Sequence, residues 1–277
     1  MNYRHAFHAG NFADLQKHAI LLTLLAALTA EETPLSVIDT HAGAGAYDLG
    51  GDMAQRSGEA AAGIGRLLAM PENSGGAPAV FAALVAAVKA LNGGGEGPLY
   101  PGSPLLIAGH LRKTDRYTAC ELRPDDCDSL RRTLAPYPFA QAVKDDGYAT
   151  AVARAGKGGR TFVLIDPPFE RSDDYAQIIA TTRAVLARDK SAVIAAWMPL
   201  KDLETFDAFM RAMETVTRDA LAAELRLRPL TDPMKMNGCA MVMVGAPKST
   251  EGAIAEITTW LADNLGDAGA KARIWRA

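Results

Sequence analysis

The sequence contains few of the residues that would indicate a metal site, a disulfide framework or a membrane span. Its three cysteines show no C-x-x-C spacing, and its five histidines form no H-x3-H or H-E-x-x-H pattern. We therefore expect reduced thiols, no metal and a cytoplasmic location. The apolar segment from Ala19 to Ala30 is too short to cross a membrane and starts too late for a signal peptide. We expect it to form a buried helix, and we expect no membrane partner.

An excess of positive charge is also missing. The 277 residues include 29 Lys and Arg against 32 Asp and Glu, which gives a formal net charge of -3 and a pI near 6.0. Proteins that hold RNA mainly by its phosphates usually present a basic face, so the charge balance argues against that class. A content of 49% hydrophobic and 22% charged residues suits one globular domain, alone or with an insertion. We expect a monomer.

The most informative stretch is Asp166-Pro167-Pro168-Phe169, which follows the apolar run Thr161 to Ile165. That run has the length and β-branched character of a buried parallel strand, and the two prolines prevent its continuation. Asp166 is therefore expected at the carboxyl end of a strand, on the edge where open α/β sheets bind ligands. Enzymes that methylate amines use the pattern D-P-P-[YF], although an ordinary Asp-Pro turn explains it equally well.

A second strand, Leu35 to Asp39, leads into the small-residue loop Thr40 to Tyr47, which we expect to open a helix. Gly43 and Gly45 would let the backbone approach a ligand closely. A dinucleotide fingerprint needs a third glycine where Asp48 stands. A strand-end acid followed by G-x-G favours S-adenosylmethionine, the cofactor of methyltransferases.

Residues 49–98 are rich in alanine and glycine, and we predict a small helical insertion subdomain there, which divides a main domain formed by 1–48 and 99–277. A ribose-binding acid is expected roughly 20 residues after a glycine loop. The first good candidate, Glu121, comes 76 residues after Gly45, and the insertion accounts for the excess. The predicted helices of the insertion are Glu59 to Met70 and Ala79 to Leu91.

Strands alternate with helices along the rest of the chain. We predict a helix start at Asn11, an N-cap at Ser103, and a strand ending at Asp145-Asp146-Gly147, where an Asx turn explains the acids as readily as a ligand does. The remaining predicted elements are helices 124–134, 174–186, 200–213 and 251–265, strands 141–144, 192–197, 222–227 and 239–244, a loop over the site at 229–238, and a basic tail. This alternation predicts an α/β fold with a mostly parallel, doubly wound sheet and an antiparallel edge, the Rossmann-like layout of class I methyltransferases.

Several segments together resemble the RlmJ family of 23S ribosomal RNA adenine-N6 methyltransferases, and the resemblance runs nearly end to end. The segments are Tyr3-Arg4-His5-Ala6-Phe7-His8-Ala9-Gly10-Asn11, Asp14 with Lys17-His18, Asp39-Thr40-His41-Ala42-Gly43-Ala44-Gly45, Tyr100-Pro101-Gly102-Ser103-Pro104, Asp146-Gly147 and Asp166-Pro167-Pro168-Phe169. The resemblance implies S-adenosylmethionine as cofactor and 23S ribosomal RNA, naked or in early assembly, as substrate.

The resemblance also implies a role for each matching residue. The implied cofactor contacts are His18, His41, Ser103, Glu121, Asp146, Gly147 and Asp166, to which we add Lys17, Gly43 and Gly45. Asp166 is the implied catalytic acceptor, and Tyr3 the residue that meets the RNA. Phe169 stands where tyrosine is usual, which keeps a stacking face but loses a hydroxyl group.

The chemistry of adenine explains why such residues are needed. Its exocyclic nitrogen shares its lone pair with the ring, so we expect Asp166 and the Pro167 carbonyl to accept its two N-H groups and turn the lone pair toward the methyl group. Phe169 would stack on the extruded base, which Tyr3 and His8 would help to hold. Two rival classes share parts of this pattern: a DNA-adenine or protein-glutamine methyltransferase, and an RNA-binding module without catalysis.

Overall fold

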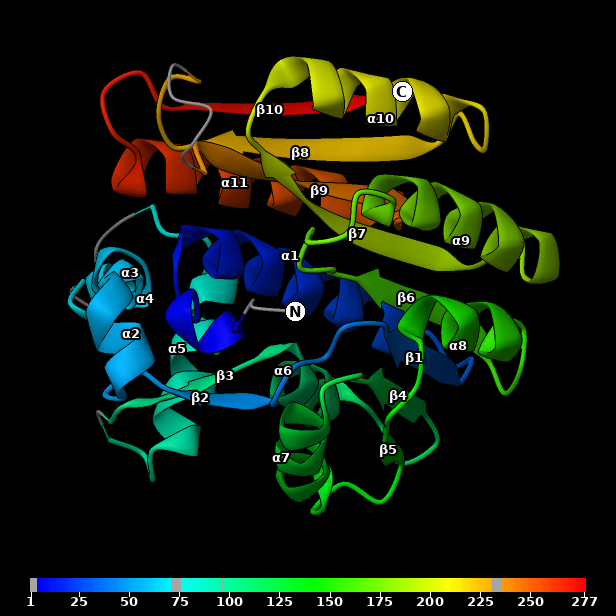
Figure 1. Ribbon diagram of the computed structural model, residues 1–277, viewed down its shortest axis with the longest axis horizontal. Helices are drawn as coiled ribbons and strands as arrows, with labels where there is room; N and C mark the ends of the chain where they lie inside the picture. The colour runs from blue at the N-terminus through cyan, green and yellow to red at the C-terminus, as the bar shows by residue number, and fades with distance from the viewer. Residues whose placement is uncertain (1–3, 71–75, 96, 231–235) are drawn as a thin grey trace.

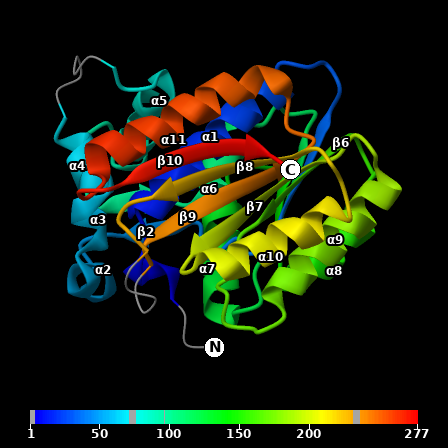
Figure 2. The same ribbon diagram turned by 90° about the horizontal axis from the view of Figure 1, so that it is seen from above.

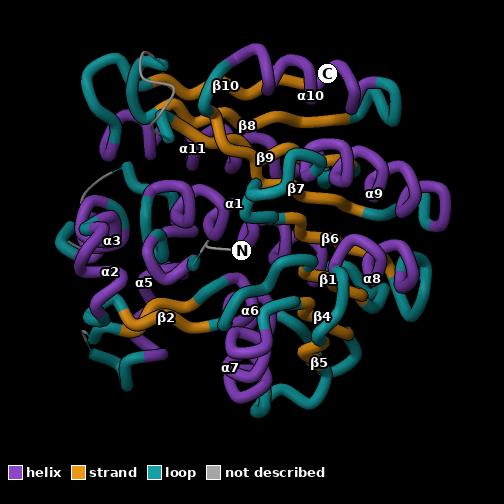
Figure 3. Tube along the Cα trace, viewed as in Figure 1, coloured by secondary structure: helices purple, strands orange, loops and turns teal. Residues whose placement is uncertain are grey.

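An eight-stranded sheet forms the centre of the molecule, with helices on both of its faces (Figures 1 and 3). The computed structural model describes residues 4–70, 76–95, 97–230 and 236–277. The strand order is β10-β8-β9-β7-β6-β1-β4-β5. The strands are β1 Leu35–Asp39, β4 Arg116–Cys120, β5 Ala140–Val143, β6 Arg160–Ile165, β7 Val193–Leu200, β8 Ala220–Arg226, β9 Gly238–Val244 and β10 Lys271–Arg276.

The strand directions define the class of the fold. Strands β5, β4, β1, β6 and β7 pair in parallel, and β9 lies antiparallel between β7 and β8. Strand β10 pairs antiparallel with β8 and forms the edge. This is the Rossmann-like sheet of class I methyltransferases with one added strand, so the predicted fold class and antiparallel edge strand are confirmed. The prediction of a basic tail is wrong, because Lys271–Arg276 is that edge strand.

Two helical layers enclose the sheet, and Figure 2 shows α1 and α11 on one side of it and α9 and α10 on the other. One layer contains α1 Phe12–Thr29, α6 Ser103–His110, α7 Pro124–Leu134 and α11 Glu251–Leu265. The other contains α8 Gly147–Arg154, α9 Asp174–Arg188 and α10 Leu203–Glu214. Each layer buries its own apolar cluster against the sheet. The three cysteines are free and buried, and Cys239 and Cys120 belong to these clusters.

Helix α1 crosses the first layer. By length and composition alone it could span a membrane, but 72% of it is buried inside the protein, so it is a core helix, as predicted. Its start is also confirmed, because the Asn11 side chain accepts a hydrogen bond from the Asp14 backbone N-H at 3.0 Å. The cap fixes the first turn of α1, which carries Asp14. Lys17 lies one turn further along the helix.

The segment between β1 and α6 is helical and is closed by a small second sheet. Its elements are β2 Ala46–Asp48, α2 Asp52–Ser57, α3 Glu59–Ala62, α4 Ile64–Leu68, α5 Ala79–Leu91 and β3 Leu99–Pro101, and β2 pairs with β3. The predicted helix after the glycine loop is wrong, since the loop enters β2. The predicted helix from Glu59 to Met70 is broken at Gly63, where Ile64 N-H donates to the Gly10 carbonyl at 2.8 Å. A separate insertion subdomain stays a prediction, and the side chains of α5 pack into the same apolar cluster as α1.

Candidate active site

A cavity of about 400 Å³ opens at the carboxyl ends of β1, β4 and β6. The start of α8, the first turns of α1 and α6, and residues 4–6 complete its wall. The predicted site residues that lie on this wall are Lys17, His41, Gly43, Ser103, Glu121, Asp146, Gly147 and Asp166. The structure thus brings together residues that are up to 149 positions apart in the chain.

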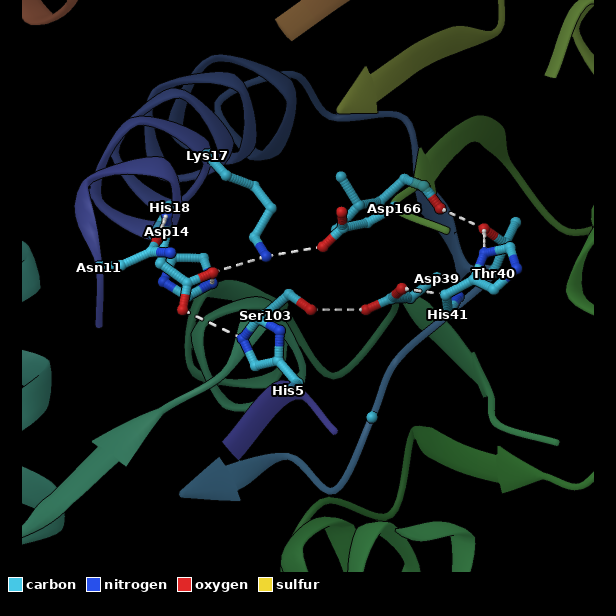
Figure 4. Close-up of polar contacts among 12 residues, drawn as sticks. His5, Asn11, Asp14, Lys17, His18, Asp39, Thr40, His41, Ser103 and Asp166 are labelled. Atoms are coloured by element: carbon cyan, nitrogen blue, oxygen red, sulfur yellow. Dashed lines mark hydrogen bonds and ion pairs between the residues drawn. The ribbon is translucent and has the colours of Figure 1, made fainter. Parts of the chain in front are cut away.

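Asp166 belongs to a row of alternating charges that crosses from β6 to α1 (Figure 4). The Lys17 ammonium donates to Asp166 Oδ2 at 2.6 Å and contacts Asp14 Oδ1 at 2.8 Å. Asp14 Oδ2 also accepts from Gly10 N-H at 2.9 Å and lies 3.1 Å from His5 Nε2. This row holds Asp166 by one oxygen. No described residue bonds its other oxygen, Oδ1, which leaves that atom available to a ligand.

The contacts in this row hold Asp14 and Lys17 in their ionised states. Burial would raise the pKa of Asp14, but the charges of His5 and Lys17 hold that pKa well below its usual range. Burial would likewise lower the pKa of Lys17, but Asp14 and Asp166 hold it well above its usual range. Lys17 is therefore a cation beside Asp166 at physiological pH.

The end of β1 carries a second, fully buried carboxylate. Ser103 Oγ donates to Asp39 Oδ2 at 2.9 Å, and the Tyr117 hydroxyl donates to the same oxygen at 3.3 Å. Burial raises the pKa of Asp39 to about 6. The prediction that Ser103 caps its helix is wrong: α6 begins at Ser103 itself, and the hydroxyl is turned toward Asp39.

The glycine loop connects β1 to the carboxylate at the end of β4. Glu121 accepts from the backbone N-H groups of Gly43 at 3.0 Å and Arg123 at 2.7 Å, and burial raises the pKa of Glu121. Gly43 has a φ of 65°, and a Cβ there would lie 2.2 Å from the Tyr47 hydroxyl. The position therefore requires glycine, which brings the backbone to the cavity wall.

The start of α8 closes against the same loop. Asp146 is the N-cap of α8, and its Oδ1 accepts from Ala149 N-H at 2.9 Å. Gly147 lies so close to β1 that a Cβ would stand 1.9 Å from the Thr40 carbonyl oxygen. Asp146 therefore has the local backbone contact that an Asx turn predicts, and it also lies on the cavity wall.

His41 projects from the loop toward the cavity. Its Nδ1 lies 2.7 Å from Thr40 Oγ1, and its ring packs edge-on against Tyr148 with centroids 5.0 Å apart. Burial lowers the pKa of His41 to about 4, so the ring is neutral at physiological pH.

Some predicted site residues do not lie on the wall. His18 is fully buried behind it, with Nδ1 2.8 Å from the Tyr100 hydroxyl, and burial lowers the pKa of His18 to about 3. Gly45 packs against Thr133 of α7. His8 pairs with Glu59 at 3.0 Å outside the cavity.

The D-P-P-F motif divides between the wall and the layer behind it. Pro168 lines the cavity, whereas Pro167 is buried and absent from the wall. Phe169 has a φ of 51° and packs between Tyr175 and Trp197, with ring centroids 4.9 and 5.9 Å away. Such strained backbone in a non-glycine residue clusters at functional sites. Tyr3 and residues 231–235 of the predicted loop over the site lie outside the described residues.

Residues near the N-terminus contribute more to the site than the sequence analysis assigned to them. Arg4 and His5 line the cavity, and His5 and Asp14 extend the charged row from Lys17. The spacing of Asp14 and Lys17, three residues apart in a helix, was a signal for their ion pair. Nothing in the sequence indicated that the pair would meet Asp166.

The sheet order and the site together define the class of protein. A class I methyltransferase sheet carries, on its carboxyl edge, a close-approach glycine loop after β1, a carboxylate at the end of β4 and a D-P-P-F motif after β6. The chain is a methyltransferase of this class. A family model described as "Ribosomal RNA large subunit methyltransferase D, RlmJ" matches residues 32–277, and the chain belongs to this family.

Individual relatives agree with the family model. The chain is similar to "Ribosomal RNA large subunit methyltransferase J" of Escherichia coli K12, at 32% identity over 97% of this chain and 95% of that protein. The protein of the same name from Haemophilus influenzae is 34% identical over 96% and 94%. A crystal structure of the Legionella pneumophila protein LPL1258 has 27% identity and a TM-score of 0.88, with 98% of each chain covered. The predicted resemblance is confirmed.

S-adenosylmethionine is the cofactor, as predicted from the glycine loop and the family. The residues present fit this group. The Gly43 backbone lies on the cavity wall at the end of β1, and the Glu121 carboxylate at the end of β4 suits ribose hydroxyls. Asp146, Ser103 and His41 add polar atoms along the same wall.

Proposed function

We propose that this protein methylates the exocyclic N6 amine of an adenine in 23S ribosomal RNA, in the cytoplasm, on naked RNA or an early assembly intermediate. The observation that carries the proposal is the state of Asp166, which lines the cavity: Lys17 holds Oδ2 at 2.6 Å, and Oδ1 has no hydrogen-bond partner among the described residues. The names of the bacterial relatives support large-subunit ribosomal RNA as the substrate.

The fixed carboxylate supplies what an adenine amine lacks. Asp166 Oδ1 accepts one N-H of the amine, so that the nitrogen becomes tetrahedral and its lone pair is directed out of the ring plane. The cofactor supplies an electrophilic methyl group on a sulfonium. Attack of the nitrogen on that methyl group would break the methyl-sulfur bond and leave its electron pair on sulfur, which becomes a neutral thioether. The amine then loses one proton to Oδ1, and Asp166 passes the proton to solvent. Pro167 remains the proposed second acceptor, through its carbonyl oxygen.

Lys17 and Phe169 support this arrangement from two sides. Lys17 fixes the rotamer of Asp166 and balances its charge in a site from which most water is excluded. Phe169 is the aromatic residue that ends the D-P-P-F motif, and its packing on Tyr175 and Trp197 fixes the position of the ring. We propose that the extruded base stacks there.

The test is methyl transfer by Asp166→Asn, with Asp128→Asn on the exposed surface of α7 as the matched control. Asparagine keeps the size of the side chain but cannot take the proton, so N6-methyladenosine formation should fall by at least about 100-fold at saturating S-adenosylmethionine. The control should keep full activity. RNA affinity should survive in both variants.

The same assay distinguishes the rival substrates. Labelled methyl transfer is measured to naked 23S ribosomal RNA from cells lacking this protein, to duplex DNA and to protein, followed by nucleoside analysis. Label in DNA or in glutamine would overturn the RNA assignment. Near-normal turnover by the asparagine variant would show that Asp166 only shapes the turn.

A further inference from the structure

Two hydrogen-bonding atoms meet at the hydroxyl group of Thr40, at the junction of β1 and the cavity. Thr40 Oγ1 lies 2.7 Å from His41 Nδ1 and 3.1 Å from the Leu164 carbonyl oxygen of β6. The Thr40 backbone N-H also donates to that carbonyl, at 3.0 Å. The hydroxyl has one proton, so it can donate to only one of its two neighbours.

Only one placement of this proton satisfies both contacts. If the hydroxyl donated to His41 Nδ1, two oxygen acceptors, Thr40 Oγ1 and Leu164 O, would face each other at 3.1 Å with no hydrogen between them. If it donates to Leu164 O, its lone pair accepts from a proton on His41 Nδ1, and both contacts are hydrogen bonds. The second arrangement places the ring proton on Nδ1.

The other ring nitrogen then has a defined role. Burial keeps the His41 ring neutral, so a proton on Nδ1 leaves Nε2 as a hydrogen-bond acceptor. Nε2 has no hydrogen-bond partner among residues 4–70, 76–95, 97–230 and 236–277, and the ring lies on the cavity wall. An acceptor in that place selects a ligand group that donates a hydrogen bond.

We propose that Thr40 is a positioning residue that fixes the Nδ1-H tautomer of His41, so that Nε2 accepts a hydrogen bond from the α-ammonium group of bound S-adenosylmethionine. The carboxylates of Asp146 and Asp166 act on this ring and favour a cationic donor, and the charge of Arg171 opposes them. The adenine amine is the other N-H source in the proposed reaction. The inference deepens the proposed function and rests on it for the ligand, but the tautomer is a property of the protein alone.

The first measurement is ¹⁵N NMR of the His41 ring in the free protein, with His41→Gln to assign the signals. The Nδ1-H pattern is expected in the wild type and in Thr40→Ser, which restores the hydroxyl. Thr40→Val keeps the branched shape and removes the hydroxyl, so the ring should change to the Nε2-H tautomer. An Nε2-H wild-type ring would overturn the inference whatever the substrate of the enzyme, and this observation needs no variant to fold.

The second measurement is calorimetric binding of S-adenosylmethionine and of its analogue without the amino group. Thr40→Val should weaken cofactor binding by about 10- to 100-fold, the loss of a hydrogen bond to a charged group, and Thr40→Ser should recover it. The analogue should bind the wild type and Thr40→Val alike. Unchanged cofactor affinity in a Thr40→Val protein with a changed tautomer, with a raised KM for RNA instead, would overturn the ammonium assignment in favour of the adenine amine. Failure of the proposed RNA substrate would leave these binding results intact.

Discussion

At the scale of single residues, Asp14 is the group on which the charged row depends. It is 3% exposed and accepts from Gly10 and Lys17 while contacting His5. Asp14→Asn would leave the buried Lys17 ammonium with one anion and turn an amide N-H toward existing donors. We expect a loss on the order of 3 kcal/mol in the free energy of unfolding, measured by urea denaturation.

The exposed pair Asp128 and Arg131 on α7 provides the comparison for Asp14, because it is also an i,i+3 ion pair. Asp128→Asn should change the free energy of unfolding by less than about 0.5 kcal/mol. Equal losses in the two variants would contradict the idea that burial of the Lys17 charge gives Asp14 its importance.

The site residues divide into those that the sequence could predict and those that only packing defines. Asp166 and Glu121 follow apolar runs of strand length, so their place on one sheet edge could be predicted from the chain alone. The contact between Lys17 and Asp166 spans 149 residues and depends on how α1 crosses the sheet. His18 was assigned by resemblance to the cofactor, yet its side chain turns to Tyr100 behind the wall.

At the scale of elements, the start of α8 is held against the end of β1 by the absence of a side chain at Gly147. A Cβ there would lie 1.9 Å from the Thr40 carbonyl oxygen, which belongs to backbone that cannot move without disturbing the glycine loop. Gly147→Ala should lower the free energy of unfolding by about 1 to 3 kcal/mol and weaken S-adenosylmethionine binding. Denaturation and calorimetry measure the two effects.

Gly109 in α6 is the matched control for Gly147, because a Cβ there meets no atom within 4 Å. Alanine is favoured over glycine in a helix by about 1 kcal/mol, so Gly109→Ala should be neutral or stabilising. The same substitution is therefore expected to lower the free energy of unfolding at Gly147 and to leave it unchanged or raise it at Gly109. A stable Gly147→Ala protein with normal cofactor affinity would mean that α8 can shift without cost to the site.

The boundaries of most elements could be predicted, and the exceptions have local causes. Strand β1 and helices α5, α7 and α11 agree with the predicted ranges, because their apolar periodicity and flanking prolines or glycines are clear. Strand β10 is the exception at the C-terminus: Lys271-Ala272-Arg273-Ile274 alternates as a strand does, but its basic residues also fit the predicted basic tail. The glycine loop was expected to open a helix, as in dinucleotide-binding folds, but here pairing of β2 with β3 takes its place.

At the scale of the whole molecule, buried titratable groups near the site link its chemistry to the stability of the fold. His18 and His41 are held neutral, with pKa values of about 3 and 4 against an ordinary value of 6.5. The unfolded chain therefore binds two more protons than the folded protein once the pH falls below about 6.5, and this destabilises the fold. The raised pKa of Asp39, about 6 against 3.8, acts in the opposite sense, because here the folded protein binds the proton first.

The balance of these groups predicts how stability changes between pH 7 and pH 5. Two protons favour the unfolded chain and one favours the folded protein, so the net effect is about one proton, or about 1.4 kcal/mol per pH unit once the histidines of the unfolded chain are protonated. We expect the free energy of unfolding to be about 2 to 3 kcal/mol lower at pH 5 than at pH 7, by urea denaturation at constant ionic strength. Asp39→Asn removes the group that opposes the histidines. The free energy of unfolding should then fall more steeply with decreasing pH, by about 1.4 kcal/mol per pH unit. A stability that is flat or rises on acidification would show that His18 and His41 do not enter the folded state as neutral rings. An equal slope in Asp39→Asn would show that the folded protein does not bind a proton at Asp39 before the unfolded chain does.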